Sequence, residues 1–311
     1  MSKNIVTFAY TIINIYDRDE NQNDNFVYFL MLLTACGQSY EEKLKQNSTD
    51  HERMAKENAA AFKVAVMPTL DCMPVYLAKQ KHWFDSTVVD VRLRVYNAQM
   101  DCDTALKGNS VEVAITDIKR VEHLIKTNVN LVSLGHTGAY WQLISNRTAR
   151  IKTPSQLGDK MVAMTRYSAT DYLTDRLLKN AKVSAPVFKV QINDVLIRLD
   201  MLINNEMDAM WLPEPQATTA RIYKHTLMED SRQIHENIGV VAARYKLLKD
   251  KKKAKQLAAF IKGYNRACDS LNLYGVRHYS YLVEKACHTN SRTIEKLPKF
   301  SFPNISFPQR Q

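Results

Sequence analysis

The chain of 311 residues lacks any apolar run long enough to cross a membrane as a helix. Such a helix needs roughly 20 consecutive apolar residues. The most apolar stretch, "FVYFLMLLTA" at residues 26–35, supplies about half of that length. Its length is instead typical of the apolar region of a secretory signal, and we expect residues 1–35 to be a signal-like segment.

Cysteine is also scarce. Five cysteines are too few for a disulfide framework in a chain of this length, and no C-x-x-C or Cys/His metal spacing occurs. The sequence "MDCDTAL" places Asp101, Cys102 and Asp103 side by side, but neighbours along a chain rarely converge on one ion. We therefore expect neither a metal site nor a cofactor.

The common catalytic motifs are missing as well. The chain contains no G-x-S-x-G, G-x-x-x-x-G-K-[S/T], H-E-x-x-H or G-x-G-x-x-G sequence. Two acid/base candidates stay open. His136 with Asp117 competes with a plain surface-loop histidine, and Glu214 between two prolines competes with a local cap or hydrogen bond. We expect the protein not to be an enzyme.

Basic residues outnumber acidic ones, with 43 lysines and arginines against 32 aspartates and glutamates. The net charge is +11, and a lysine cluster occupies residues 249–255. No motif that combines aromatic and basic residues accompanies the cluster, so we expect no nucleic-acid partner. We interpret the cluster as a solvated helix face or turn, and the overall charge favours residence near an anionic surface.

The apolar stretch ends in Leu33-Thr34-Ala35-Cys36, which resembles a bacterial lipobox. In that motif the cysteine is acylated and holds the protein on a membrane surface. The alternative is a buried segment that contains a cysteine by chance. We favour the lipobox because residues 38–58 are poor in large apolar side chains, and we assign residues 36–61 to a tether.

The residues before the apolar stretch do not suit a signal. The run "DRDENQNDN" is acidic and polar, whereas a signal begins with a short basic region. We expect residues 1–25 to be disordered, and either the true start or the upstream reading frame to differ.

From Phe62 onward, short apolar strands alternate with amphipathic helices. The expected strands include "FKVAVM", "VVDVRLRVY", "VEVAIT", "MVAMT", "VFKVQI" and "MDAMWL". This alternation predicts an α/β fold with mainly parallel sheets. The stretches "TALKGNSVEVAITD" and "DMLINNEMDAMWLPE" repeat one order of helix, turn, strand and acid, which favours two similar lobes. The last part of the chain is predicted to be helical.

Ligands of open α/β sheets bind outside the carboxyl ends of the strands. The loops expected there are rich in hydroxyls, amides and acids, and the helix starts beside them offer free backbone N–H groups. The residues that we predict to bind a ligand are Thr69, Asp71, Gln99, Asp101, Thr116, Asp117, Tyr140, Arg166, Ser168, Ala169, Thr170, Asn193 and Glu214.

Four stretches resemble the signature regions of type 2 periplasmic substrate-binding proteins. They are "VAVMPTLDCMPVYLAKQKHWF", "GNSVEVAITD", "SQLGDKMVAMTRYSATDYLTDRLL" and "MDAMWLPEPQAT", and they resemble the branch that serves importers of nitrate, sulfonate, taurine and thiamine-pyrimidine-precursor type. The resemblance spans residues 63–296. It implies two lobes, 62–143 plus 239–311 and 144–238, joined by a hinge of two crossing segments, with the ligand favouring the closed form. The C-terminal "SFPNISFPQRQ" departs from the family pattern, which suggests a truncated copy and puts the packing of the first lobe in doubt.

The resemblance also implies a function. We expect a monomeric, lipid-anchored solute receptor of the cell envelope, facing the periplasm or the outer surface, that works with an ABC permease and ATPase. The alternatives are an enzyme of thiamine-pyrimidine biosynthesis on the same scaffold, whose cysteine-rich motif is missing here, and a ligand-sensing domain of a signalling system.

Charge and aromatic residues suggest the ligand. The loops carry four acids, Asp71, Asp101, Asp117 and Glu214, against Arg166 as the main basic residue. Tyr140, Trp141 and Tyr167 are candidates to stack on a flat ring. We therefore favour an amino-bearing heterocycle, such as a thiamine pyrimidine precursor, over nitrate or an alkyl sulfonate.

The cysteines leave a further alternative open. If the first two strands of the first lobe are neighbours, as in the family, Cys72 and Cys102 either form a disulfide or stay reduced near the cleft.

Overall fold

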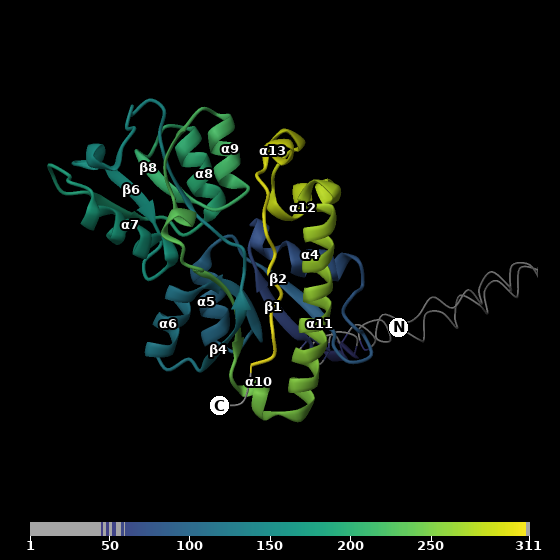
Figure 1. Ribbon diagram of the computed structural model, residues 1–311. Helices are drawn as coiled ribbons and strands as arrows, with labels where there is room; N and C mark the ends of the chain where they lie inside the picture. Colours follow the sequence, from purple (N-terminus) through teal and green to yellow (C-terminus); the bar gives the residue numbers. More distant parts are fainter. Residues whose placement is uncertain (1–44, 46–47, 50–51, 54–56, 59, 309–311) are drawn as a thin grey trace, which may run out of the picture. The chain divides into compact units, whose positions relative to one another are not determined.

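A computed structural model describes residues 45, 48–49, 52–53, 57–58 and 60–308. The expected signal-like segment, the acylation expected at Cys36, the disorder expected for residues 1–25 and most of the expected tether therefore lie outside the described residues. The chain divides into two units, residues 1–60 and 61–311, and the second unit holds both sheets (Figure 1). In the described part of the chain, no helix is both long and apolar enough to cross a bilayer.

The first sheet has the strand order β2-β1-β3-β10-β4. Its strands are β1 (Phe62–Val66), β2 (Val91–Val95), β3 (Val113–Asp117), β4 (Leu131–His136) and β10 (Gly239–Arg244). The pairs of β1 with β2 and β3 are parallel, and β10 runs antiparallel to both β3 and β4. The helices α4 (Met73–Gln80), α5 (Gln99–Lys107) and α6 (Ile118–Lys126) connect them, with the 3-10 turn η1 (Leu70–Cys72) before α4.

The second sheet repeats this plan with the order β7-β6-β8-β5-β9. Its strands are β5 (Gln142–Ser145), β6 (Met161–Met164), β7 (Phe188–Gln191), β8 (Ala209–Leu212) and β9 (Thr226–Asp230). Again three neighbouring strands are parallel, and one crossing strand, β5, is antiparallel to both of its neighbours. The helices are α7 (Ala169–Asn180), α8 (Val195–Ile203) and α9 (Gln216–Ile222), with the 3-10 turns η2 (Pro154–Leu157) and η3 (Ser231–Ile234).

The two sheets define two lobes, and the predicted α/β class with two similar halves is confirmed. We call the first sheet with α4–α6 and the C-terminal helices the first lobe, and the second sheet with α7–α9 the second lobe. The chain passes between the sheets twice, from β4 to β5 and from β9 to β10. The residue boundaries of the lobes stay a prediction.

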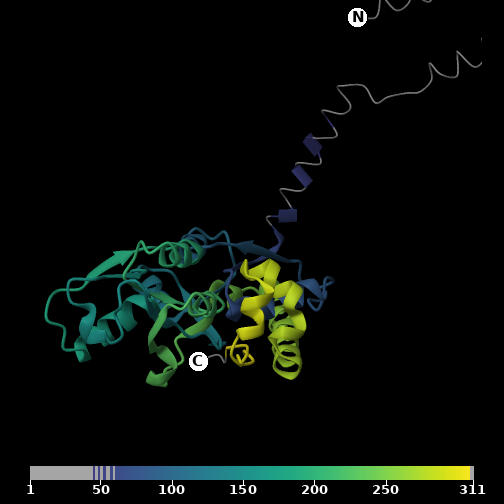
Figure 2. The ribbon, with the colours of Figure 1, turned by 90° about the horizontal axis from the view of Figure 1, so that it is seen from above.

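The C-terminal part covers the first lobe. It consists of α10 (Lys246–Lys249), α11 (Lys251–Tyr274), η4 (Val276–Tyr279), α12 (Ser280–Cys287), α13 (Ser291–Lys296) and residues 297–308. In α11 the ring of Phe260 packs 5.5 Å from the rings of both Phe62 and Phe84, measured between centroids. Figure 2 shows these yellow-green and yellow elements on the side of the body away from the teal strands and helices of the second lobe.

The last residues complete the core of the first lobe. Phe302 and Ile305 are buried. Asn272 and Phe302 exchange two hydrogen bonds, and Asn265 and Ile305 do the same. The extended end is therefore packed side chain by side chain, in contrast to the doubtful packing that the departure from the family pattern suggests.

The four cysteines of the described part are free and buried: Cys72, Cys102, Cys268 and Cys287. The open alternative of a bridge between Cys72 and Cys102 is therefore wrong in this structure. The Cys72 sulfur accepts a hydrogen bond from the backbone N–H of Met67 at 3.2 Å, so the thiol supports the turn after β1. Burial raises the pKa of Cys102 to about 12, which keeps that thiol protonated.

Candidate functional site

A cavity lies between the lobes, where the carboxyl ends of strands from both sheets meet, as expected for open α/β sheets. Its volume is about 60 Å³. On the same measure one water takes up about 10–15 Å³, so the cavity has room for a few waters. The lining residues are Met67, Thr69, Asp71, Gln99, Ile115, Thr116, Asp117, Ala139, Trp141, Thr165, Ser168, Thr170, Asn193, Val195, Arg198 and Pro213.

The structure places eight of the thirteen predicted ligand residues in this lining. From the first lobe they are Thr69, Asp71, Gln99, Thr116 and Asp117, and from the second lobe Ser168, Thr170 and Asn193. All of them lie at or just after the ends of strands or begin helices, which is why the rule for open sheets found them. Their role in binding stays a prediction.

The other five lie outside the lining. Asp101 is exposed in the first turn of α5, Ala169 is buried in the first turn of α7, and the Arg166 side chain is exposed. Tyr140 and Glu214 are buried together, with the Tyr140 hydroxyl donating to Glu214 Oε1 at 3.1 Å.

Glu214 is held within its own segment. Arg221 Nη2 forms an ion pair with Glu214 Oε1 at 2.9 Å, and the backbone N–H of Thr218 donates to Glu214 Oε2 at 3.0 Å. This matches the local hydrogen-bonding alternative rather than the general base. His136, the other acid/base candidate, is exposed at the end of β4 and does not line the cavity.

Two carboxyl groups face the cavity, and burial opposes their ionisation. Asp117 is 3% exposed and caps α6 by accepting a hydrogen bond from the backbone N–H of Arg120 at 2.9 Å. Burial raises the pKa of Asp117 to about 7, against an ordinary value of 3.8. Burial also raises the pKa of Asp71, although a hydrogen bond with the Thr69 side chain works against the shift. A ligand with amino groups offers these carboxyls donors.

One basic side chain of the lining was not found from the sequence. Arg198 of α8 is 4% exposed, and it donates to the carbonyl oxygens of Ile192 at 2.6 Å and Trp211 at 3.1 Å and to the hydroxyl of Thr165. Burial lowers the pKa of Arg198 to about 10, so the guanidinium stays charged at neutral pH. The only hint in the sequence was its place in the first turns of the helix after the 191–193 loop.

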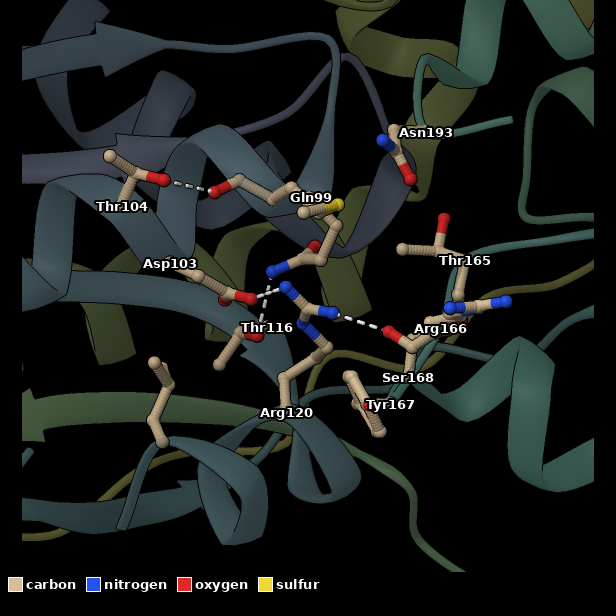
Figure 3. Close-up of polar contacts among 12 residues, drawn as sticks. Gln99, Asp103, Thr104, Thr116, Arg120, Thr165, Arg166, Tyr167, Ser168 and Asn193 are labelled. Carbon is tan, nitrogen blue, oxygen red and sulfur yellow. Dashed lines mark hydrogen bonds and ion pairs between the residues drawn. The ribbon is translucent and has the colours of Figure 1, made fainter. Parts of the chain in front are cut away.

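Hydroxyls and amides complete the polar surface. The Ser168 hydroxyl accepts from the backbone N–H of Thr170 and so caps α7, while the Thr170 hydroxyl accepts from the backbone N–H of Thr165. On the opposite lobe, Gln99 Nε2 donates to the Thr116 hydroxyl at 2.7 Å (Figure 3). These bonds fix the side chains before a ligand arrives, which lowers the entropy lost on binding.

Direct contacts join the lobes around the cavity. Arg120 of α6 forms an ion pair with Asp103 and donates across the cleft to the carbonyl oxygen of Arg166 (Figure 3). Beside it, the rings of His123 and Tyr167 stack with centroids 4.1 Å apart.

Next to Thr69 and Pro213 of the lining, two further hydrogen bonds link the lobes. Leu70 N–H donates to the Glu214 carbonyl at 2.9 Å, and Gln216 Nε2 donates to the Pro68 carbonyl at 2.8 Å. The lobes are therefore in contact at two separate places near the cavity. Among the residues that the structure describes, no group of three or more His, Cys, Asp or Glu residues is arranged to hold a metal ion.

Comparisons with known proteins agree with this architecture. The alkanesulfonate-binding protein SsuA from Xanthomonas axonopodis pv. citri, bound to MOPS, matches with a TM-score of 0.67 and 13% identity over 79% of this chain and 87% of its own. The aliphatic sulphonate-binding protein SsuA from Escherichia coli matches with a TM-score of 0.62 and 15% identity, over 78% of this chain and 85% of its own. The nitrate-binding protein NrtA from Synechocystis PCC 6803 matches with a TM-score of 0.64 and 13% identity, over 75% of this chain and 68% of its own.

These likenesses show the fold, and they confirm the resemblance to type 2 periplasmic binding proteins at that level. No curated protein sequence matches the chain. A family model described as NMT1/THI5 like matches residues 69–272, which is well over half of the chain. The chain therefore belongs to the NMT1/THI5-like family.

Proposed function

We propose that the protein is the solute-binding receptor of an ABC-type importer and that its two lobes close on a small polar ligand. The observation that carries the proposal is the cavity between the lobes, lined by residues of both sheets and by side chains already fixed through hydrogen bonds. Closure on a ligand shifts the population toward the form in which both lobes contact it. The partners are then a permease and an ATPase, and the receptor itself is a monomer.

The cavity supports an amino-bearing heterocycle, such as a thiamine pyrimidine precursor, as the ligand. Asp71 and Asp117 accept hydrogen bonds from amino groups, and Trp141 offers a flat apolar surface in the same lining. Neither carboxyl forms an ion pair with a lysine or arginine of the described residues. Two such buried carboxyls disfavour the binding of a fully charged anion. The preference therefore rests on fewer acids than the sequence suggested, because Asp101 and Glu214 lie outside the lining.

A receptor for a sulfonate or nitrate is the second candidate. The observation that favours it is Arg198, whose buried guanidinium lines the cavity and contacts carbonyl and hydroxyl oxygens but no carboxylate in the described residues. Alkanesulfonate and nitrate are the ligands named for structures with this fold. Ionised carboxyls favour the amino-bearing heterocycle, whereas protonated carboxyls favour a sulfonate or nitrate.

The anchor and the location are proposals of their own. We propose that Cys36 is acylated and holds the receptor at the cell envelope. Replacing Cys36 by Ser then releases the protein from membranes and abolishes labelling by palmitate. Equal labelling of both proteins contradicts the anchor and leaves the receptor proposal untouched.

Calorimetry on the full chain with Cys36→Ser tests the ligand. A 4-aminopyrimidine, taurine and nitrate are titrated into this protein and into Asp71→Asn and Asp117→Asn variants. We expect the aminopyrimidine to bind and each substitution to weaken it by about 1.5–3 kcal/mol, the range for hydrogen bonds to charged groups. Asp101→Asn is the matched control, because that acid lies in the first turn of α5, two residues after Gln99, but outside the lining. Tight binding of taurine or nitrate that ignores the substitutions removes the heterocycle and supports the second candidate.

A further inference from the structure

A second cavity lies at the end of the first lobe that is opposite the cleft. Its volume is about 370 Å³, and its lining is Lys107, Asn109, Thr127, Asn128, Val129, Asn130, Arg244, Tyr245, Lys246 and Lys249. Four of these residues are cationic and none is acidic. Sheet register fixes the location, because Arg244 follows Ala243, which pairs with Val113 at the start of β3, whereas the cleft lies beyond the end of β3. Figure 1 shows α10 and the start of α11 at this end.

The cations of this cavity are only partly engaged. Arg244 Nη1 donates to the carbonyl oxygen of Leu106 at 2.9 Å, but Arg244 Nε is buried and has no hydrogen-bond partner in the described part of the chain. Lys246 Nζ donates to Asn109 Oδ1 at 3.2 Å, and Lys249 Nζ lies 5.4 Å from the centre of the Tyr245 ring. The guanidinium thus offers a desolvated donor that an anion satisfies.

The acids near the cavity are already used. Glu112 accepts from the backbone N–H of Lys63 at 2.7 Å and forms an ion pair with Lys253 at 3.5 Å. Asp250 caps α11 by accepting from the backbone N–H of Lys253 at 2.9 Å. Burial lowers the pKa of Lys246, and the neighbouring charges of Arg244 and Lys253 act in the same direction. The cations therefore repel one another, and a bound anion relieves that repulsion.

The first turn of α11 extends the positive surface. Lys251, Lys252 and Lys253 occupy it, and it contains no acid. Cations are unfavourable at the N-terminus of a helix, where the helix dipole is positive. Lys253 has its ion pair with Glu112, but the stability of this 24-residue helix gives no reason for Lys251 and Lys252, whereas an anionic partner does.

The same end of the sheet is where the chain enters the second unit. β1 begins at Phe62, and the backbone N–H of Glu112 donates to the Lys63 carbonyl at 2.8 Å, one strand from Arg244. Arg244 N–H in turn donates to the Glu112 carbonyl at 3.0 Å. The first residues of the second unit, from Ala61 onward, therefore lie at the same end of this sheet as the basic cavity.

We propose that this basic end binds the phosphate groups of anionic phospholipids, with one headgroup phosphate seated in the cavity beside Arg244. The charge, the unsatisfied donor and the point of chain entry together favour a lipid surface over an acidic protein. Because the cleft lies at the other end of β3, a protein held this way presents its cleft away from the membrane. The inference rests on the proposed envelope location but not on the identity of the ligand in the cleft.

Vesicle co-sedimentation of the full chain with Cys36→Ser tests the proposal without a lipid anchor. The vesicles contain one-third phosphatidylglycerol and two-thirds phosphatidylcholine, and pure phosphatidylcholine vesicles serve as the neutral reference. We compare a Lys107→Gln/Lys246→Gln/Lys249→Gln variant with a matched variant on the second lobe, Lys179→Gln/Lys182→Gln/Lys224→Gln. The lysines of both variants are exposed. Both variants lose the same charge.

We expect the first variant to lose partitioning roughly 100-fold, since each basic residue near an anionic surface contributes roughly fivefold. The matched variant should change it by less than about threefold, and added salt should release the unsubstituted protein. Equal losses in the two variants, or equal binding to neutral vesicles, overturn the proposal. If glycerol 3-phosphate raises the melting temperature but the protein does not bind vesicles, the ligand of the cavity is a soluble phosphate and the proposal is wrong. If the protein binds polyglutamate but not vesicles, the partner is an acidic protein and the proposal is also wrong. If the first variant does not fold, the vesicle and salt comparisons on the unsubstituted protein still decide.

Discussion

Arg120 Nη1 donates a 2.5 Å hydrogen bond to the carbonyl oxygen of Arg166, and this bond crosses from α6 of the first lobe to the loop before α7 of the second. The same guanidinium forms an ion pair with Asp103 of α5, and both side chains are at least 90% buried. A buried charge pair in one lobe thus supports a contact to the other.

The buried pair predicts strong coupling between its members. Arg120→Met leaves the Asp103 carboxylate buried without its partner, and Asp103→Leu does the same to the guanidinium. Each change should lower the free energy of unfolding by about 3–5 kcal/mol. The double variant should recover most of that loss, except about 1 kcal/mol for the bond to Arg166. Urea denaturation of the four proteins measures the cycle, and losses that simply add would show that the pair is not coupled.

The raised pKa of Asp117 predicts that stability falls as the pH rises. Below about pH 3.8 both the folded and the unfolded chain hold the proton, so the carboxyl makes no difference. Between that value and the folded pKa of about 7, the unfolded chain releases the proton while the folded one keeps it, which favours unfolding increasingly. The penalty is complete above pH 7 and is on the order of 2–4 kcal/mol.

Asp117→Asn isolates this effect, because the amide oxygen can still accept the hydrogen bond from Arg120 N–H. The difference in unfolding free energy between the variant and the unsubstituted protein should increase in favour of the variant from pH 5 to pH 8. Urea denaturation at both pH values measures the gain, with Asp101→Asn at an exposed position as the control. An equal difference at the two pH values would mean that Asp117 titrates normally.

Much of the cavity could be anticipated from the sequence because the position of strand ends is a local property. Apolar runs mark the strands, and parallel strands bring their carboxyl ends to one edge, so the sequence places Asp71 and Asp117 together. Ser168 belongs to the second sheet, and only the two-lobed arrangement that the family resemblance implies brings it to the same site. Arg198 was missed because a helical side chain reaches the cavity only through the way that α8 packs on its sheet. That packing is set by tertiary contacts.

The same limit explains why Glu214 lies outside the lining of the cavity. Glu214 follows a strand end, yet its carboxylate turns toward Arg221 in the next helix, α9, and toward Tyr140 on the segment that crosses from β4 to β5. Charge in a sequence does not reveal which partner neutralises it. The strand β9 and the helix α9 were also not predicted, since their short polar sequences carry a weak periodic pattern.

The buried cysteines predict a clear thiol count. In the full chain with Cys36→Ser, four cysteines remain, and burial raises the pKa of each, to about 12 for Cys102 and Cys268. Because the thiolate is the reactive form, a disulfide reagent should modify none of them quickly in the folded protein. After unfolding without reductant it should modify four. A count of two would reveal a bridge.

The C-terminal segment predicts a sharp requirement for glycine at position 138. A Cβ atom there would lie 1.8 Å from the carbonyl oxygen of Ser301 and 3.0 Å from the Phe300 ring, so Gly138→Ala must displace the segment. We expect a loss of at least about 3 kcal/mol of unfolding free energy, at the upper end of overpacking costs, and faster proteolysis near residue 301. Gly108→Ala is the control, because its Cβ would meet only the Thr104 carbonyl, at 3.1 Å. Similar stability of the two variants would show that residues 297–308 contribute little to the first lobe.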